Sequence, residues 1–452
     1  MTWALYYLLH SFSPSLPWQS CNNTWNAVGN CSTGFPGNAT HLQSASQHHK
    51  VLEMTKGIEH AGGIRWELFG LLVLAWAIVY FCIFKGVKST GKVVYFTATF
   101  PYFILFALLI NNVQLPGAKD GILFFLMPNW SKLLEVQVWV NAAAQVFNSI
   151  GISFGSMISM ASYNKYNNNI LKDTFIVSLA NSATSIVAGF VIFSAIGYMA
   201  HIHNLPVDDI ATDGPGLVFV VYPEVFSTMP ISQLWAPLFF IMLLCLGLDS
   251  QFAMVEVAVT FIMDGFGKKA LQVFKRKELI VLAVCSVGFL LGIPHISRSG
   301  IYVFQLMDHY TAVVSLMFLA FFERRLSLMV EKMLGKKPNL FFRVCWQYLS
   351  PMLVLGILIS SIFQYTPARY GKSYTYPLWA EVVGWFISLA SIIWIPLGAL
   401  HELWTTKGSL LQCLSPSLLQ RLKKSITPAI DLEFDSEKPS SESICLLIRS
   451  AK

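Results

Sequence analysis

LFFIMLLCLGLDSQFAMVEV, the run from Leu238 to Val257, is apolar enough to cross a membrane, yet it contains an acidic residue near its middle. A membrane-spanning helix needs about 20 predominantly apolar residues to cross a hydrocarbon layer of about 30 Å. Within this run Ser250 directly follows Asp249, and Glu256 comes about two helical turns later. Because an acid at mid-bilayer costs about 2.5 to 3.5 kcal/mol on insertion scales, Asp249 needs a partner or a water-filled cavity.

The composition of the whole chain is that of an integral membrane protein. Of the 452 residues, 55% are hydrophobic and 12% are charged, whereas an average soluble domain carries about 25% charged residues. The net charge of +7 comes from basic residues clustered between apolar runs, which indicates membrane orientation and not nucleic-acid binding. The apolar runs predict an all-α polytopic protein with about nine full spans, near residues 68–85, 92–112, 137–162, 173–200, 234–263, 279–297, 299–323, 341–365 and 376–404.

The segment 19–66 is predicted to be an extracellular glycosylated loop. Glycans and disulfides both form in the secretory lumen or outside the cell. We expect the two cysteines of this loop to form a disulfide, with two free thiols as the alternative. The three sequons and the two cysteines are Asn22, Asn30, Asn38, Cys21 and Cys31.

The remaining chain is predicted to divide at the membrane surface. Residues 1–18 form a partial transmembrane helix, 67–404 form the transmembrane bundle, and 405–452 form a cytoplasmic tail. The loop 201–233, on the outer side, has no Lys or Arg. The positive-inside rule therefore gives the same orientation as the sequons.

Asp249 is a candidate cation ligand. No Lys or Arg lies in its span to pair with it, while Gly247 leaves space and Ser250 adds an oxygen. Carboxylate, hydroxyl and backbone oxygens suit a hard cation, and sodium is the first candidate. The alternative is a protonated Asp249 in a hydrogen bond between helices. No role as an ion ligand is predicted for Glu256. One interpretation is that it makes a structural contact with another helix.

The span 137–162 is predicted to be broken at its middle. Gly151 and Gly155 stand among polar residues there, and broken helices at membrane depth occur only where they line a cavity. The alternative role for these glycines is close packing of helices. Gln145 and Ser149 stand four apart and so share one face, as do Asn181 and Ser185 in the next span.

Together these polar groups predict a site for salt and a small solute. Hydrogen-bond donors suit an anion, and clustered side-chain oxygens suit cations. Aromatic and amide side chains border the same cavity. The donors are Gln145, Ser149 and Ser185; the oxygens are those of Ser149, Asn181, Asp249 and Ser250; the bordering residues are Phe147, Asn148 and Phe154.

At these residues the chain resembles the neurotransmitter sodium symporter family of sodium- and chloride-coupled carriers. The resemblance rests on motifs in the expected order along nearly the whole chain: LPWQSC, FKGVKSTGKVVYFTATFPY, ASYNKYNNN, GPGLVFVVYPE, LGLDSQF and YPLWAEVVGW. It implies an inverted-repeat helical bundle in the plasma membrane, and this family is itself a known case of broken helices at the binding site.

The resemblance also implies residue roles and alternating-access symport of a small amino acid, or an amino-acid-derived neurotransmitter or osmolyte. Sodium and chloride would be co-transported, with no cofactor and no enzymatic activity. Asn148 stands where the family usually has an aromatic lid. The implied sodium ligands are Leu246, Asp249 and Ser250 at one site and Ser149 and Asn181 at another; the chloride ligands are Gln145, Ser149 and Ser185; the substrate contacts are Phe147, Asn148, Gly151, Phe154 and Ser250.

Against the family pattern, the chain begins partway through the expected third helix, so the residues of the first two helices are absent. The alternative hypothesis is therefore a truncated, transport-incompetent isoform that assembles with full-length relatives and modulates them. Its expected partners are membrane lipid, the substrate and related transporters. Only one cluster stands near the spacing of zinc ligands: His201, His203, Asp208 and Asp209. A zinc site is not expected there, because scattered polar residues are usual in an outer loop.

Overall fold

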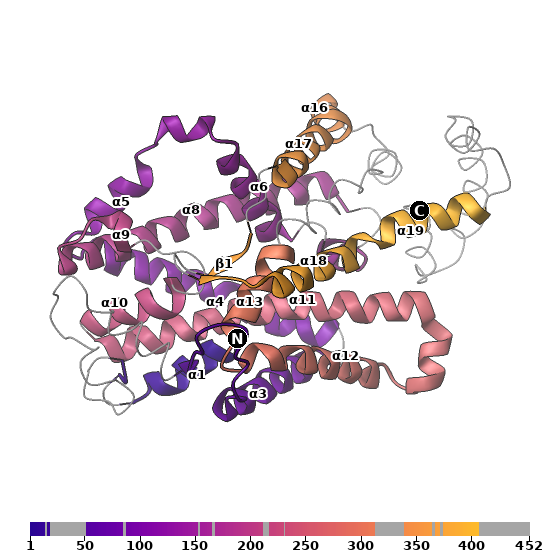
Figure 1. Ribbon diagram of the computed structural model, residues 1–452, viewed down its shortest axis with the longest axis horizontal. Coiled ribbons are helices and arrows are strands. Elements are labelled where there is room, and N and C mark those ends of the chain that lie inside the picture. Colours follow the sequence, from indigo (N-terminus) through magenta and orange to yellow (C-terminus); the bar gives the residue numbers. More distant parts are fainter. Residues whose placement is uncertain are drawn as a thin grey trace.

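The computed structural model describes residues 1–13, 16–18, 51–84, 87–151, 154–164, 168–210, 217–229, 231–311, 339–363, 367–370 and 374–405. Within these ranges all regular structure is helical except one short hairpin, and the long helices lie side by side (Figure 1). The predicted all-α class is confirmed. Several predicted features lie outside the described residues: Asn22, Asn30, Asn38, Cys21, Cys31 and the tail from 406 to 452.

The helices follow one another with short connections in the described ranges. The hairpin pairs β1 (Arg369–Tyr370) antiparallel with β2 (Tyr374–Thr375). The α-helices are α1 (Thr2–Ser11), α3 (Trp66–Ile83), α4 (Val87–Val113), α5 (Ala118–Leu126), α6 (Val136–Ile150), α7 (Ser156–Ala161), α8 (Ile170–His203), α9 (Val207–Ile210), α10 (Tyr222–Thr228), α11 (Ser232–Phe274), α12 (Lys277–Gly292), α13 (Gly300–Tyr310), α16 (Leu340–Val344), α17 (Ser350–Phe363), α18 (Leu378–Ile392) and α19 (Trp394–Thr405). Short 3₁₀ or π segments are η2 (Trp130–Leu134), η3 (Leu217–Val221), η4 (Ile293–Ile296) and η6 (Cys345–Leu349).

Five described helices are long and apolar enough to cross a membrane: Trp66–Ile83, Val93–Val113, Ile170–His203, Ser232–Gly267 and Lys277–Ile296. They coincide with five predicted spans to within a few residues. The predicted spans 137–162 and 376–404 are each divided into two helices, and the described part of 299–323 is α13.

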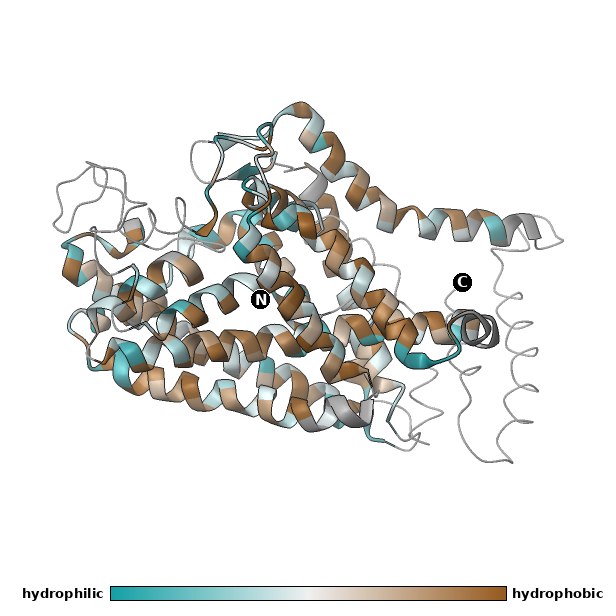
Figure 2. Cartoon of the chain, turned by 90° about the horizontal axis from the view of Figure 1, so that it is seen from below, coloured by the Kyte–Doolittle hydropathy of each residue, from teal (hydrophilic) through white to brown (hydrophobic). Residues whose placement is uncertain are grey.

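The surface of these helices is largely apolar. Phe81, Phe103 and Leu291 have most of their side chains exposed, and Figure 2 shows hydrophobic residues spread along the helices. A helix that is apolar on its exposed side is suited to lipid and not to water. The chain therefore has the surface expected of a multi-pass membrane protein.

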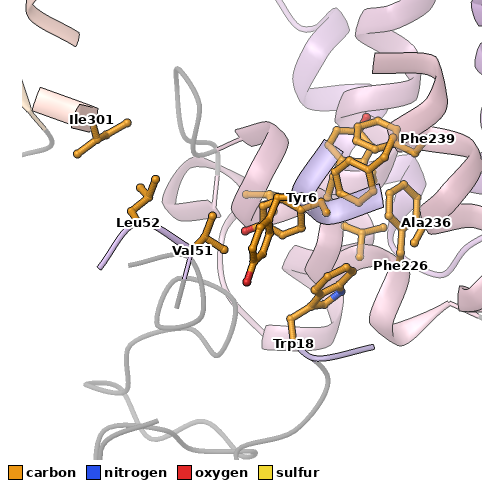
Figure 3. Close-up of a cluster of buried hydrophobic side chains, with 14 of the residues drawn as sticks. Tyr6, Trp18, Val51, Leu52, Phe226, Ala236, Phe239 and Ile301 are labelled. Atoms are coloured by element: carbon orange, nitrogen blue, oxygen red, sulfur yellow. The ribbon is translucent and has the colours of Figure 1, made fainter. Parts of the chain in front are cut away.

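The main core lies where α1 meets α10 and α11. The Tyr7 ring stacks on Phe240 with ring centroids 5.2 Å apart, and its hydroxyl donates to the Phe219 carbonyl at 3.0 Å. Trp18 and Phe226 belong to the same cluster of buried side chains (Figure 3). Buried tyrosines are stable where the ring is packed and the hydroxyl is paired. This packing fixes the first half of α11 and so the depth of its polar residues.

Helices α5 and α8 approach each other at backbone distance. A Cβ on Gly121 would lie 1.9 Å from the Phe193 carbonyl oxygen, and one on Gly197 would lie 2.6 Å from the Gly117 carbonyl oxygen. Small residues permit such close contact between membrane helices. The contact fixes the position of the second half of α8. The first half of the same helix contains the predicted ligands Asn181 and Ser185.

The segment that precedes α3 is tied to two parts of the chain that are distant in sequence. Glu53 forms ion pairs with Arg65 and with Arg298, the latter at 2.9 Å. Tyr374 of β2 donates a hydrogen bond to Glu59 Oε2 at 3.1 Å. Burial, with a smaller effect of the Glu59 carboxylate, raises the pKa of Tyr374 above its ordinary value. These contacts fasten the segment to the hairpin and to the residues before α13.

Candidate ion and solute site

The predicted break between α6 and α7 is present. Helix α6 ends at Ile150, Gly151 follows with φ +77°, and Gly155 has φ +75° directly before α7 begins at Ser156. Glycine adopts this left-handed conformation without the steric cost that other residues have. A Cβ on Gly155 would lie 3.5 Å from Val257 Cγ1, so the break lies beside α11.

Two of the predicted ligands meet between α6 and α8, and a third lies one turn further along α8. Ser149 Oγ donates to Asn181 Oδ1 at 2.8 Å, which joins the two helices. Ser185 Oγ donates to the Asn181 backbone carbonyl at 3.0 Å, one turn earlier in its own helix. Each hydroxyl keeps lone pairs that can accept or coordinate. The side chain of Gln145, one turn before Ser149, is exposed.

The predicted solute contacts flank this cluster. Phe147, Gly151 and Phe154 are half-buried, and Asn148 is exposed at the last turn of α6. Phe147 and Asn148 also supply the carbonyls that accept the Gly151 N–H, at 3.0 and 3.2 Å. The aromatic rings, the amide and the helix end thus stand within a few residues of the break.

The second group of predicted ligands lies on α11. Asp249 is half-buried, and its Oδ1 accepts a hydrogen bond from the hydroxyl of Thr97 on α4. Ser250 Oγ donates to the Leu246 carbonyl at 3.2 Å. A carboxylate has lone pairs on two oxygens, so one hydrogen bond does not exhaust its capacity to bind a cation. Within the described ranges, no hydrogen bond links this group to the Ser149–Asn181 cluster.

The sequence gives no signal for Thr97. Asp249 has no partner in its own span, and its partner in the structure is the neutral hydroxyl of a residue on α4, 152 positions earlier in the sequence. Thr97 and Thr99 stand in the same apolar run, and only Thr97 is buried. Which of the two faces α11 depends on the rotation of α4, which the pattern of the run leaves undetermined.

Glu256 has partners of its own. Its Oε1 accepts a hydrogen bond from Tyr163, just after α7, at 2.8 Å and lies 3.5 Å from Lys277 Nζ at the start of α12. Ser159 of α7 donates to Thr260 of α11 at 3.4 Å beside it. Glu256 therefore links the middle of α11 to the end of α7 and the start of α12, and its role in the structure is a contact between helices.

The two histidines considered for zinc lie in the last turn of α8 and not in a loop, and one of them has a different partner. His203 Nε2 lies 3.2 Å from Glu224 Oε1 of α10, while the side chains of His201 and Asp208 are exposed. Among the residues that the structure describes, no group of three or more His, Cys, Asp or Glu could hold a metal ion.

The chain matches one protein family over most of its length. The sequence profile of the Sodium:neurotransmitter symporter family matches residues 1–406. "Sodium- and chloride-dependent GABA transporter ine" of Drosophila melanogaster is 44% identical over 446 residues, 95% of this chain and 47% of that protein. "Sodium- and chloride-dependent GABA transporter 2" of Homo sapiens is 42% identical, over 96% of this chain and 73% of that protein. "Sodium- and chloride-dependent glycine transporter 2" of Xenopus laevis is 41% identical, over 95% of this chain and 59% of that protein.

The chain thus spans about half the length of the Drosophila relative and about three quarters of the human one. Among solved structures it is similar to the crystal structure of MhsT in complex with L-phenylalanine, with a TM-score of 0.60 and 19% identity. The match covers 80% of this chain and 76% of that one. At this identity the likeness establishes a shared fold and nothing finer.

Proposed function

Because the chain belongs to the sodium:neurotransmitter symporter family, we propose that the protein carries a small amino acid or a derivative across the plasma membrane together with sodium and chloride. The family is one of transporters, so the prediction that the protein is not an enzyme is confirmed. The observation that carries the proposal is the glycine-capped break between α6 and α7, with the Ser149–Asn181 contact at its edge.

A break of this kind supplies backbone ligands inside the membrane. The carbonyls at the end of a helix lack intrahelical partners and carry partial negative charge, which favours a cation or an ammonium group. At the break, Ser149 adds a hydroxyl and Asn181 an amide oxygen from α8. These neutral oxygens fit a monovalent ion, which needs less negative charge in its shell than a divalent one.

We assign ligands to the co-transported ions on this basis. One sodium ion takes the oxygens of Ser149 and Asn181, and a second takes the Asp249 carboxylate with the oxygens of Leu246 and Ser250. Chloride takes the donor groups of Gln145, Ser149 and Ser185. The substrate contacts Phe147, Asn148, Gly151, Phe154 and Ser250.

The ions supply the driving force for accumulation. Each positive charge that moves into the cell with a membrane potential of 100 mV contributes about 2.3 kcal/mol. Asp249 gives one sodium ion a full negative charge to bind within the membrane. Alternating access then requires that the ions and the solute bind from one side and leave to the other.

The named solutes of the relatives give the first substrates to test, GABA and glycine. Uptake of both, radiolabelled, is to be measured in cells that express the protein, with sodium replaced by choline or chloride by gluconate. We expect uptake to require both ions and to be lost in Asp249→Asn. Asp120→Asn, the same change at an exposed position on α5, is the matched control and should leave uptake unchanged.

Uptake that is equal with and without sodium, or that survives in Asp249→Asn, would refute the proposal. If the protein gives no uptake but lowers the surface level of a co-expressed relative, the alternative function, modulation of related transporters, takes its place. Surface biotinylation of both proteins separates these outcomes from failed expression.

A further inference from the structure

The Thr97 hydroxyl lies between two acceptors on different helices. Its oxygen is 3.1 Å from the Val93 carbonyl, one turn earlier in α4, and within hydrogen-bond distance of Asp249 Oδ1 on α11. A hydroxyl has one proton, so it donates to only one of them at a time. Only 4% of Thr97 is exposed, so water does not compete for that proton.

The charge on Asp249 decides which acceptor receives the proton. With no cation beside it, a carboxylate at membrane depth needs a donor, and a hydrogen bond to a charged acceptor is stronger than one to a neutral carbonyl. With a cation on the carboxylate, the hydroxyl proton is repelled and the Val93 carbonyl becomes the better acceptor.

We propose that Thr97 is the residue that replaces sodium on Asp249 when the ion leaves. This rests on the proposed function, because it takes Asp249 as a sodium ligand. Thr97 acts through Asp249 as a positioning residue: it lowers the free energy of the ion-free site and so makes release easier. Its hydrogen bond from α4 to Asp249 on α11 forms only in the ion-free state.

The proposal predicts the sign of a mutational effect. Thr97→Val keeps the shape of the side chain and removes the hydroxyl, which leaves the ion-free carboxylate without its donor. Sodium binding should therefore become tighter by about tenfold, equivalent to about 1.4 kcal/mol. A residue that only shaped the site would weaken sodium binding when replaced.

The test is equilibrium binding of ²²Na⁺ to the purified full-length protein, with ionic strength held constant by choline. Thr97→Val should lower the half-saturating sodium concentration about tenfold, and Thr97→Ser, which keeps the hydroxyl, should restore it to within about twofold of the parent protein. Thr99→Val is the matched control, because the Thr99 hydroxyl donates within its own helix, to the Tyr95 carbonyl at 2.6 Å. If Thr97→Val does not fold, Thr97→Ala replaces it with the same expected direction.

Unchanged or weaker sodium binding in the hydroxyl-free variants would overturn the inference while leaving sodium coupling intact. If the parent protein binds no ²²Na⁺, or if Asp249→Asn binds it as well as the parent, the proposed function fails first and this inference fails with it. The two failures are therefore distinguished by the parent and Asp249→Asn measurements alone.

Discussion

Separate and combined replacement of Lys277 and Glu256 tests how the Glu256 carboxylate in the middle of α11 is held. The Glu256 side chain is 5% exposed and that of Lys277 is 38% exposed. Lys277→Met leaves the buried carboxylate with the Tyr163 hydroxyl, and removal of one member of a buried ion pair costs about 3 to 5 kcal/mol. Because Lys277 is more than a third exposed, solvent screens the pair, and we expect a cost of about 3 kcal/mol at most.

The opposite replacement should cost less. Glu256→Gln keeps an oxygen that accepts from Tyr163 and leaves a lysine that water can solvate, so we expect a loss of about 1 kcal/mol. In the double variant no carboxylate remains to be stranded. Its cost should fall below the sum of the single costs by about 2 kcal/mol, within the range seen for residues in one network.

Free energies of unfolding are to be measured by reversible denaturant unfolding in mixed micelles, with the slopes compared to detect changes in the unfolded state. The exposed pair Lys132 and Glu135, with Nζ and Oε1 2.9 Å apart, is the matched control, and the same replacements there should cost less than about 1 kcal/mol. Additive costs at Glu256 and Lys277, or a cost for Lys277→Met no larger than for Glu256→Gln, would refute the reasoning.

Two further outcomes follow from the packing. Gly121→Ala should destabilise the protein by about 1 to 3 kcal/mol, because its Cβ would lie 1.9 Å from the Phe193 carbonyl oxygen, whereas Gly70→Ala, with open space around it, should cost nothing in the same unfolding assay. Tyr374, whose pKa is raised by burial, should ionise above the ordinary tyrosine value of about 10. Its contribution to stability is then complete at lower pH and is lost as the pH rises through the folded-state pKa. The difference in tyrosinate absorbance between the parent protein and Tyr374→Phe measures this titration, and a value at or below 10 would contradict it.

The spans and the break were predictable because each depends on a short stretch of sequence. A run of apolar residues long enough to cross the bilayer must form a helix, since no other open structure satisfies its backbone in lipid. The break between α6 and α7 follows from Gly151 and Gly155, which adopt left-handed conformations at both edges. Neither inference needs to know which helix lies next to which.

The partners of the polar residues depend on neighbouring helices and were beyond reach. Asp249 and Glu256 are seven residues apart, which is about two turns, so periodicity puts them on one face and does not distinguish their roles. In the structure that face meets α4 at the first acid and the ends of α7 and α12 at the second. The first acid therefore receives a neutral hydroxyl, which leaves its charge available to an ion, and the second receives a lysine, which uses that charge to hold helices together. What separates a candidate ion ligand from a structural contact along one face of α11 is the identity of the helix opposite each residue.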